Sequence, residues 1–497
     1  MSEISKNPEH RYVSDLRRLD TSQTVVARSL GSFLPISFAA LFLAVVAFFA
    51  ATTFGIAREG SLLIVCAAIF GGYMALNIGA NDVANNMGPA VGGRVLTIAT
   101  AIIIAAVCEA AGALIAGGDV VNTVSKGIIA PGGAISVKEF QYLMLSAVFA
   151  AALWINIATA LGAPVSTTHS IIGGVLGGGI AASGLGLVNW PTMGQIAASW
   201  VISPIAGGVI AAMLLAFIKA KILYAPKRLE AAAFWVPLLI ALMASAFTAY
   251  MTMKGLKNVW TAGVLEITIV SVAAFLIAWL ASRPYVAAKI SRLADRRSHI
   301  NTLFDLPLII GVGLLSFAHG ANDVANAVGP LAAIVSTSDA QHGIAAKVTI
   351  PFWVMIVGAL GISIGLATFG PKLIRVVGEQ ITRLNSPRAY CVALSAAITV
   401  LVATSLGLPV SSTHIAVGAV FGVGFLREHT ENPNRRKLRP GHKLNATAAE
   451  AFNSRYVKRS RYLVRRRFLW SIAAAWVITV PATALLAGLL YVLLQLL

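Results

Sequence analysis

The sequence predicts an all-α polytopic membrane protein with about 12–13 transmembrane segments. Of its 497 residues, 58% are hydrophobic and only 11% are charged, and the mean hydropathy is +0.81. A soluble domain carries roughly 25% charged residues. Many uncharged runs reach about 18 residues, the length that spans the hydrocarbon core of a bilayer. Because backbone groups in lipid must be satisfied within their own segment, these runs predict helices.

Thirteen apolar runs are expected to form the segments, and two of them are short, glycine-rich and typical of half-helices or re-entrant elements. Those two are 165–184 and 411–426. The full set is 34–57, 62–79, 95–117, 143–162, 165–184, 195–218, 233–251, 263–281, 303–319, 348–369, 389–407, 411–426 and 468–496. Residues 1–33 precede the first run as a polar, basic arm, and the first run itself is too long for the hydrophobic region of a cleavable signal peptide.

The charge distribution predicts the orientation of the chain. The net charge is +19, and the stretch 427–467 alone holds thirteen Lys and Arg. The stretches 219–228 and 283–297 and the N-terminal arm are also basic. A nucleic-acid site is the rejected alternative, because loops rich in Lys and Arg are typical of the cytoplasmic side of a membrane protein. We therefore expect a cytoplasmic N-terminus, no nucleic-acid partner, and a multi-pass protein of the cell membrane (inner or plasma membrane).

Sequence repeats predict two homologous halves. From Gly79 to Pro89 and from Gly320 to Pro330, nine of eleven positions are identical, and "LGAPVSTTHSIIGG" (161–174) matches "LGLPVSSTHIAVGA" (406–419). The expected units are an extra transmembrane helix at 34–57, a first repeat at 62–219, a connector with two helices and a basic loop at 220–302, and a second repeat at 303–497 with its basic loop at 427–467. With both basic loops inside, the two copies run in opposite directions. Inverted repeats are typical of secondary transporters, whose substrate binds near the midplane.

The first repeated motif, GANDVAN, combines glycine with amide and carboxylate side chains. We expect the helix to break there, because glycine weakens helices and the following Gly-Pro pair opposes their continuation. Irregular backbone at membrane depth is tolerated where it lines a cavity. Oxygen ligands of this kind suit a small hard cation or a proton, while helix capping is the structural alternative. The candidate residues are Asn81, Asp82, Asn85, Asn322, Asp323 and Asn326.

The second repeated motif places hydroxyl groups behind Pro164 and Pro409, at the expected start of a helix. Free N–H groups and the helix dipole make such an end attractive to an anion. Ordinary N-capping is the alternative. Two such ends could clasp one tetrahedral anion beside the cation on the aspartates. The candidate residues are Ser166, Thr167, Thr168, Ser411, Ser412 and Thr413.

Further polar residues in apolar segments are open to two interpretations. His169 and His414 follow the hydroxyl runs. They either have a functional role, in donating to the anion or relaying protons, or pack between helices with a bond to a carbonyl group. Glu109 and Glu266 are candidates because intramembrane carboxylates are commonly functional, although neither has an acidic counterpart in the other half. The glycines at 173–179 favour close helix packing.

These twin motifs resemble the PiT family of inorganic phosphate transporters from about residue 62 onward. The resemblance implies an ion-coupled phosphate symporter of roughly twelve helices with inverted repeats. In it, Asn81, Asp82, Asn322 and Asp323 bind the coupling cation, and Ser166–Thr168 and Ser411–Thr413 hold phosphate. Asn86 departs from the pattern, since Ala327 stands at the same place in the second copy. The long basic loop is similar to the bacterial proton-coupled branch, which carries phosphate as a neutral metal complex.

We therefore expect a secondary active symporter that imports inorganic phosphate by alternating access, is not an enzyme and uses no cofactor. The driving ion is H⁺ or Na⁺, with Asp82 and Asp323 as metal ligands if it is Na⁺, and co-transport of a divalent metal is left open. The partners are phosphate and the lipid bilayer, and a homodimer is also left open. The alternatives are a sulfate permease on the same scaffold, an anion channel, or a receptor that merely spans the membrane.

Overall fold

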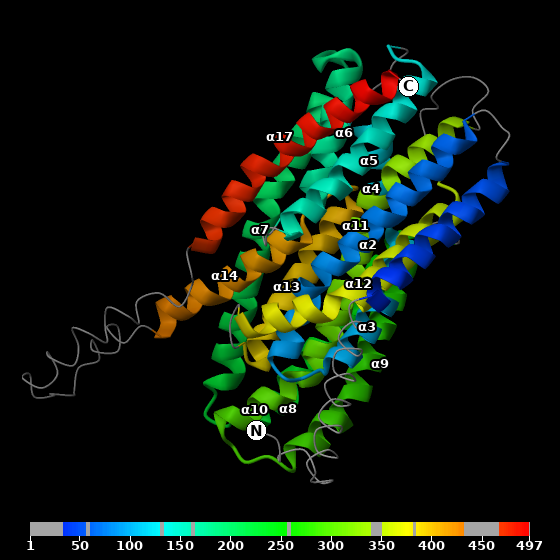
Figure 1. Cartoon of the computed structure of the whole chain (residues 1–497). Helices are drawn as coiled ribbons and strands as arrows, with labels where there is room; N and C mark the ends of the chain where they lie inside the picture. Colours follow the sequence, from blue (N-terminus) through cyan, green and yellow to red (C-terminus); the bar gives the residue numbers. More distant parts are fainter. Residues whose placement is uncertain are drawn as a thin grey trace, which may run out of the picture.

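The computed structural model describes residues 33–55, 60–129, 134–160, 165–255, 260–338, 350–380, 384–431 and 467–496. Within these ranges the regular elements are all helices, and eleven of them are long and apolar enough to cross a membrane. Two further helices, α6 (Thr167–Ser183) and α14 (Ser412–Glu431), bring the total to the thirteen expected segments. The predicted all-α polytopic class is confirmed (Figure 1).

The long helices share an apolar composition on all sides, as expected where one side meets protein and the other meets lipid. In chain order they are Phe33–Phe54, α2 (Ser61–Gly92), α3 (Ile98–Ala116), α5 (Val137–Ala160), α7 (Trp190–Ile218), α8 (Arg228–Tyr250), α9 (Val264–Ile290), α11 (Asp305–Ser338), α12 (Phe352–Gln380), α13 (Ser386–Ser405) and α17 (Arg467–Gln495).

The prediction that the helices break at the GANDVAN motifs is wrong. Helix α2 continues through Pro89, and α11 continues through Pro330. The motif glycines serve helix crossing instead. A methyl group at Gly79 would overlap the Ile362 carbonyl oxygen, and one at Gly320 would overlap the Glu109 carbonyl oxygen. Small residues let helix backbones approach closely in a membrane. The motif therefore offers side chains to a ligand, and not freed backbone carbonyl groups.

Packing partners are exchanged between the two halves of the chain. Helix α2 packs on α12 whereas α11 packs on α3, and α6 packs on α17 whereas α14 packs on α7. Reciprocal contacts identify equivalent positions: Gly112 lies against the Phe317 carbonyl group, as Gly365 lies against that of Leu76. This exchange is what a pseudo-twofold relation between repeats produces. The proposed residue boundaries of the repeats stay a prediction.

The two motif helices run antiparallel. A Cβ at Gly93, just after the end of α2, would lie 3.5 Å from the Leu384 carbonyl oxygen. At the start of α11, Asp305 Oδ1 accepts a 2.6 Å hydrogen bond from the Ser386 hydroxyl group. Since Leu384 and Ser386 are neighbours in the chain, α2 ends where α11 begins. The predicted opposite orientation of the two copies is confirmed.

The chain interrupts its helices ahead of α6 and α14. Between α13 and α14, residues 406–411 form an irregular segment that turns at Gly407, whose φ of 68° is in the left-handed region that favours glycine. Ahead of α6, Ser166 is extended, with φ −89° and ψ 126°. Pro164, most of the N-terminal arm and residues 432–466 of the basic loop lie outside the described residues.

Candidate functional site

The two motif aspartates meet in the interior of the bundle. Asp82 and Asp323 are each only 1% exposed. One oxygen of each carboxylate and one nitrogen of His319 all lie within 4.8 Å of one another. Because Asp82 is on α2 and Asp323 on α11, the antiparallel crossing brings together acids that are 241 positions apart in the sequence. The sequence prediction that these acids form a joint site agrees with this geometry.

The start of α6 points a hydroxyl group at both aspartates. Thr167 Oγ1 lies 3.2 Å from Asp82 Oδ2 and 3.5 Å from Asp323 Oδ2. A threonine hydroxyl has one proton, so it donates to one carboxylate at a time. The start of α14 matches this arrangement in part, because Ser412 Oγ lies 3.5 Å from Asp323 Oδ2.

A second layer of hydrogen bonds crosses between the halves. Thr413 on α14 donates to Asp82 Oδ1 at 2.9 Å and accepts from the Asn85 side-chain amide at 2.9 Å. At the repeat-related position, Thr168 on α6 accepts from the Asn326 amide at 3.0 Å. Thr168 then donates to the Val410 carbonyl oxygen at 3.0 Å, and not to a carboxylate. The two halves are therefore similar but not identical at the site.

Ser166 and Ser411 act as helix caps. Ser166 Oγ accepts from the His169 amide at 3.3 Å, and Ser411 Oγ accepts from the His414 amide at 3.4 Å. For these two serines the capping alternative is confirmed. A cap satisfies only part of the first turn, so the amides of the first two residues of each helix keep no intrahelical acceptor. Two helix ends with free amides are suited to an anion.

Asn322 holds the irregular segment ahead of α14. Its side-chain amide donates to Thr404 Oγ1 at 2.9 Å and to the Leu408 carbonyl oxygen at 3.0 Å, and its oxygen accepts from the Val410 amide at 3.1 Å. It thus positions the helix start through the backbone. The chain segment that Asn81 would hold by symmetry, 161–164, lies outside the described residues.

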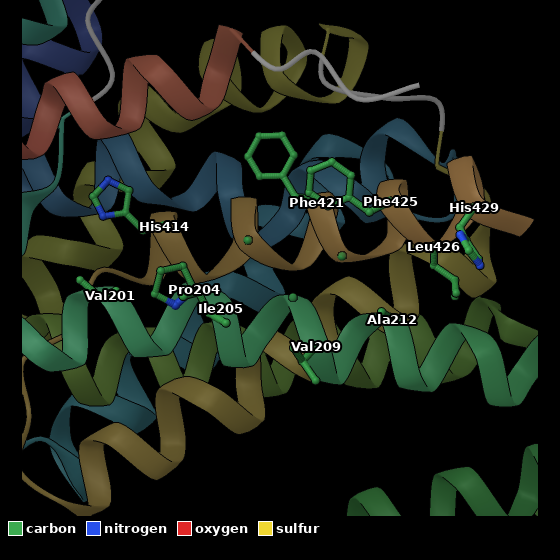
Figure 2. Close-up of a pocket in the computed structure, with 13 residues that line it drawn as sticks. Val201, Pro204, Ile205, Val209, Ala212, His414, Phe421, Phe425, Leu426 and His429 are labelled. Atoms are coloured by element: carbon green, nitrogen blue, oxygen red, sulfur yellow. The ribbon is translucent and has the colours of Figure 1, made fainter. Parts of the chain in front are cut away.

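His169 and His414 pack against each other, with ring centroids 5.1 Å apart. His169 also lies 3.9 Å, centroid to centroid, from the Trp200 ring, and Trp200 donates to the Pro409 carbonyl oxygen. These ring contacts fit the packing interpretation of the pair, and its functional role stays a prediction. His414 borders an apolar groove of about 620 Å³ between α7 and α14, at the end opposite to His429 (Figure 2).

Sequence reasoning missed His319, the residue immediately before the second motif. It is fully buried; its Nε2 lies 3.1 Å from Asp323 Oδ2 and its Nδ1 lies 3.2 Å from Glu109 Oε1. Glu109, also fully buried, accepts from the Asn86 amide at 2.9 Å. A signal was present in the repeat, because Ile78 occupies the equivalent place in the first copy. Glu266 instead caps the exposed start of α9 by accepting from the Gly263 amide at 2.7 Å.

The charge balance of this cluster favours positive ligands. Three carboxylates, those of Asp82, Asp323 and Glu109, surround one imidazole, and none of the described contacts of the cluster involves Lys or Arg. Buried charges are expensive unless they are paired or coordinate an ion. The arrangement can therefore accept a cation on its acids while the adjacent helix starts offer donors to an anion.

Comparison with known proteins places this chain in a family. A model described as "Phosphate transporter family" matches residues 78–487. A "Putative phosphate permease" of Helicobacter pylori strain J99 is 44% identical over 507 residues, which cover 92% of this chain and 95% of that protein. A "Putative phosphate permease" of Pyrococcus horikoshii is 36% identical, with 86% of this chain and 97% of that protein covered.

A solved structure is also similar to this one. The structure titled "The sodium-dependent phosphate transporter" superimposes with a TM-score of 0.77 at 35% sequence identity. The match covers 88% of this chain and 100% of that chain. The family match covers both repeated motifs and spans most of the helices described above. The chain belongs to the phosphate transporter family, and is accordingly a multi-pass membrane transporter and not an enzyme.

Proposed function

We propose that this protein is a secondary active symporter that imports inorganic phosphate by using a cation gradient. One observation carries the proposal: each buried aspartate meets hydroxyl groups at a helix start from each half of the chain. Asp82 contacts Thr167 on α6 and Thr413 on α14. Asp323 contacts Thr167 on α6 and Ser412 on α14. Two of these contacts, Asp82 to Thr413 and Asp323 to Thr167, join the two halves. A movement of one half against the other must break them, so occupancy of the site and access to it are coupled.

Phosphate binds, in this proposal, between the starts of α6 and α14. Their free first-turn amides supply donors without any buried Lys or Arg. The hydroxyl groups of Thr167 and Ser412 add donors when they turn from the carboxylates to the anion. The cation binds on Asp82 and Asp323, beside the anion. Each charge lowers the free energy needed to bury the other. The side chains of Asn85, Asn322 and Asn326 position the hydroxyl groups and the irregular segment.

The acids favour phosphate over sulfate as the anion. Phosphate at neutral pH keeps a proton that it can donate to a carboxylate, whereas sulfate has none. A site built to accept a substrate hydrogen bond discriminates strongly against an analogue that lacks it. Acids on the path also disfavour the anion-channel alternative, because they repel a permeating anion.

The coupling ion is Na⁺ or H⁺. The solved relative at 35% identity is named as sodium-dependent, which makes Na⁺ the first ion to test. The N-terminus is cytoplasmic in this proposal, because the basic N-terminal arm and the basic stretch 283–297 then obey the positive-inside rule. The same orientation puts the end of α2 and the start of α11 on the cytoplasmic side.

Reconstituted protein tests the proposal. Purified protein in liposomes should accumulate labelled phosphate under an inward Na⁺ gradient or an inward H⁺ gradient, each imposed alone, and an ionophore that dissipates the effective gradient should abolish accumulation. Asp82→Asn and Asp323→Asn should each remove accumulation, while Asp295→Asn, at a half-exposed ion pair with Arg228, should not. Equilibration without accumulation under either gradient would instead indicate a channel.

A further inference from the structure

The environment of the two aspartates breaks the symmetry of the repeats. The reciprocal helix contacts pair Gly79 with Ile362 and Gly320 with Glu109, so Ile362 is the counterpart of Glu109. The repeated motif likewise pairs His319 with Ile78 and Asn86 with Ala327. Three polar residues that are linked through Glu109 therefore correspond to three apolar residues at the repeat-related positions. Neither helix packing nor the repeat itself requires these polar residues.

The three residues form a chain that ends at the aspartates. Asn86 Nδ2 donates to Glu109 Oε1 at 2.9 Å, and Glu109 Oε1 lies 3.2 Å from His319 Nδ1. His319 Nε2 faces Asp323 Oδ2 at 3.1 Å and Asp82 Oδ2 at 3.8 Å. Neither imidazole nitrogen forms a hydrogen bond of good geometry with the described residues, and Asp323 Oδ1 also has no such partner.

We propose that His319, Asp82 and Asp323 form a binding site for a divalent first-row transition metal of the Zn²⁺ or Co²⁺ type, oriented by Glu109 and Asn86. Metal-binding histidines almost always donate their other ring N–H to a carboxylate, a backbone carbonyl group or a water molecule, which fixes the orientation of the ring. Glu109 Oε1 lies 3.2 Å from His319 Nδ1 and can take this role once the ring turns to align the bond. Ligands with bonds of about 2.1 Å to one ion stand about 3.0–3.5 Å apart. The 3.1 Å separation of His319 and Asp323 fits this directly, and the 3.8 Å separation of His319 and Asp82 requires a shift of a few tenths of an ångström. The two carboxylate oxygens lie within 4.8 Å of each other and close on the ion when it binds.

The donor set selects the class of metal. Imidazole nitrogen suits Zn²⁺, Co²⁺ and Ni²⁺, whereas Na⁺ and Mg²⁺ prefer oxygen alone. Two carboxylates neutralise a divalent ion, and the ion in turn satisfies buried acids that otherwise lack a cation. The metal site itself does not depend on the proposed function. One consequence does: a transition metal on Asp82 and Asp323 displaces the coupling cation and inhibits phosphate uptake.

The experiment is a Co²⁺ titration of the purified full-length protein in detergent after removal of any affinity tag. One equivalent of Co²⁺ should bind, with the visible absorption of nitrogen-and-oxygen-ligated Co²⁺, and Zn²⁺ should displace it. His319→Ile, which copies the first repeat, and His319→Gln should both abolish the spectrum. Glu109→Gln and Asn86→Ala should weaken Co²⁺ affinity about 10- to 100-fold, the usual effect of losing an outer-shell partner.

The control variant is His429→Ala, which removes an exposed histidine at the far end of α14 and should leave the titration unchanged. Size-exclusion elution verifies that each variant is folded, and the two substitutions at His319 guard against one of them misfolding. Absence of stoichiometric Co²⁺ binding to the native protein would overturn the proposal, as would a native-like spectrum in a folded His319 variant. Phosphate uptake is measured separately, so failure of metal binding leaves the proposed transport function independently testable.

Discussion

Replacing Thr413 with valine isolates one contact between the halves. The substitution keeps the shape of the side chain and removes the hydroxyl group that donates to Asp82 Oδ1 and accepts from Asn85. The repeat-related Thr168→Val change also removes one donated and one accepted bond. Its lost donor bond goes to the Val410 carbonyl oxygen, and its lost acceptor bond comes from Asn326. The pair therefore differs chiefly in whether the hydroxyl group serves a carboxylate or a neutral carbonyl group.

The expected effects follow from that difference. A hydrogen bond to a charged group contributes about 1.5–3 kcal/mol, and one between neutral groups contributes about 0.5–1.5 kcal/mol. At about 1.4 kcal/mol per factor of ten, Thr413→Val should lower Vmax/KM for phosphate uptake about 10- to 150-fold. The same conversion gives a loss of about 2- to 12-fold for Thr168→Val. The structure thus predicts unequal losses of Vmax/KM for substitutions at two equivalent positions.

Initial rates of labelled phosphate uptake into proteoliposomes, over a range of phosphate concentrations, measure both values. Thr368→Val is the matched control, because among the described residues this half-buried hydroxyl group bonds only to the Ile364 and Gly365 carbonyl oxygens of its own helix. It should stay within about twofold of the native protein. If Thr168→Val lowered Vmax/KM as much as Thr413→Val, or more, the inference that the bond to the Asp82 carboxylate contributes more than the bond to the Val410 carbonyl group would be wrong.

Three further predictions concern stability and topology. Gly79→Ala and Gly320→Ala should each lower the melting temperature in detergent, because overpacking costs about 1–3 kcal/mol, whereas Gly194→Ala has open space and should not; equal melting temperatures for all three would contradict the close crossing. The second prediction uses a background without Cys66, Cys108 and Cys391. A membrane-impermeant maleimide should label the Arg94→Cys and Ser291→Cys variants from one side of the membrane and the Ser136→Cys variant from the other. Labelling of the first two variants from opposite sides would refute the antiparallel arrangement of α2 and α11. Lys254→Met should change stability by less than about 1 kcal/mol, since its 3.4 Å pair with Asp119 is about one-third exposed; a larger loss of melting temperature would show that the pair is shielded from water.

The sequence alone determined the membrane class, the approximate number of segments, the repeat, and the residue types of the candidate site. These properties are local: hydropathy sums over a window, and a repeated motif is visible by comparing the chain with itself. The hydroxyl runs and the aspartates could be placed in one site because the inverted repeat implies a shared centre. The physical arguments for capping at Ser166 and Ser411 also needed only the neighbouring residues.

Tertiary structure decided two things that no local pattern carries. Helix α2 continues through the motif, and Gly79 lies against the Ile362 carbonyl group, so a residue that weakens an isolated helix here permits a close crossing. His319 became part of the site only through contacts with Glu109 and Asp82, which lie more than 200 positions earlier in the chain. Such contacts depend on where two helices cross and on which face each presents. Those features are set by packing of the whole bundle, which the order of residues along one segment does not reveal.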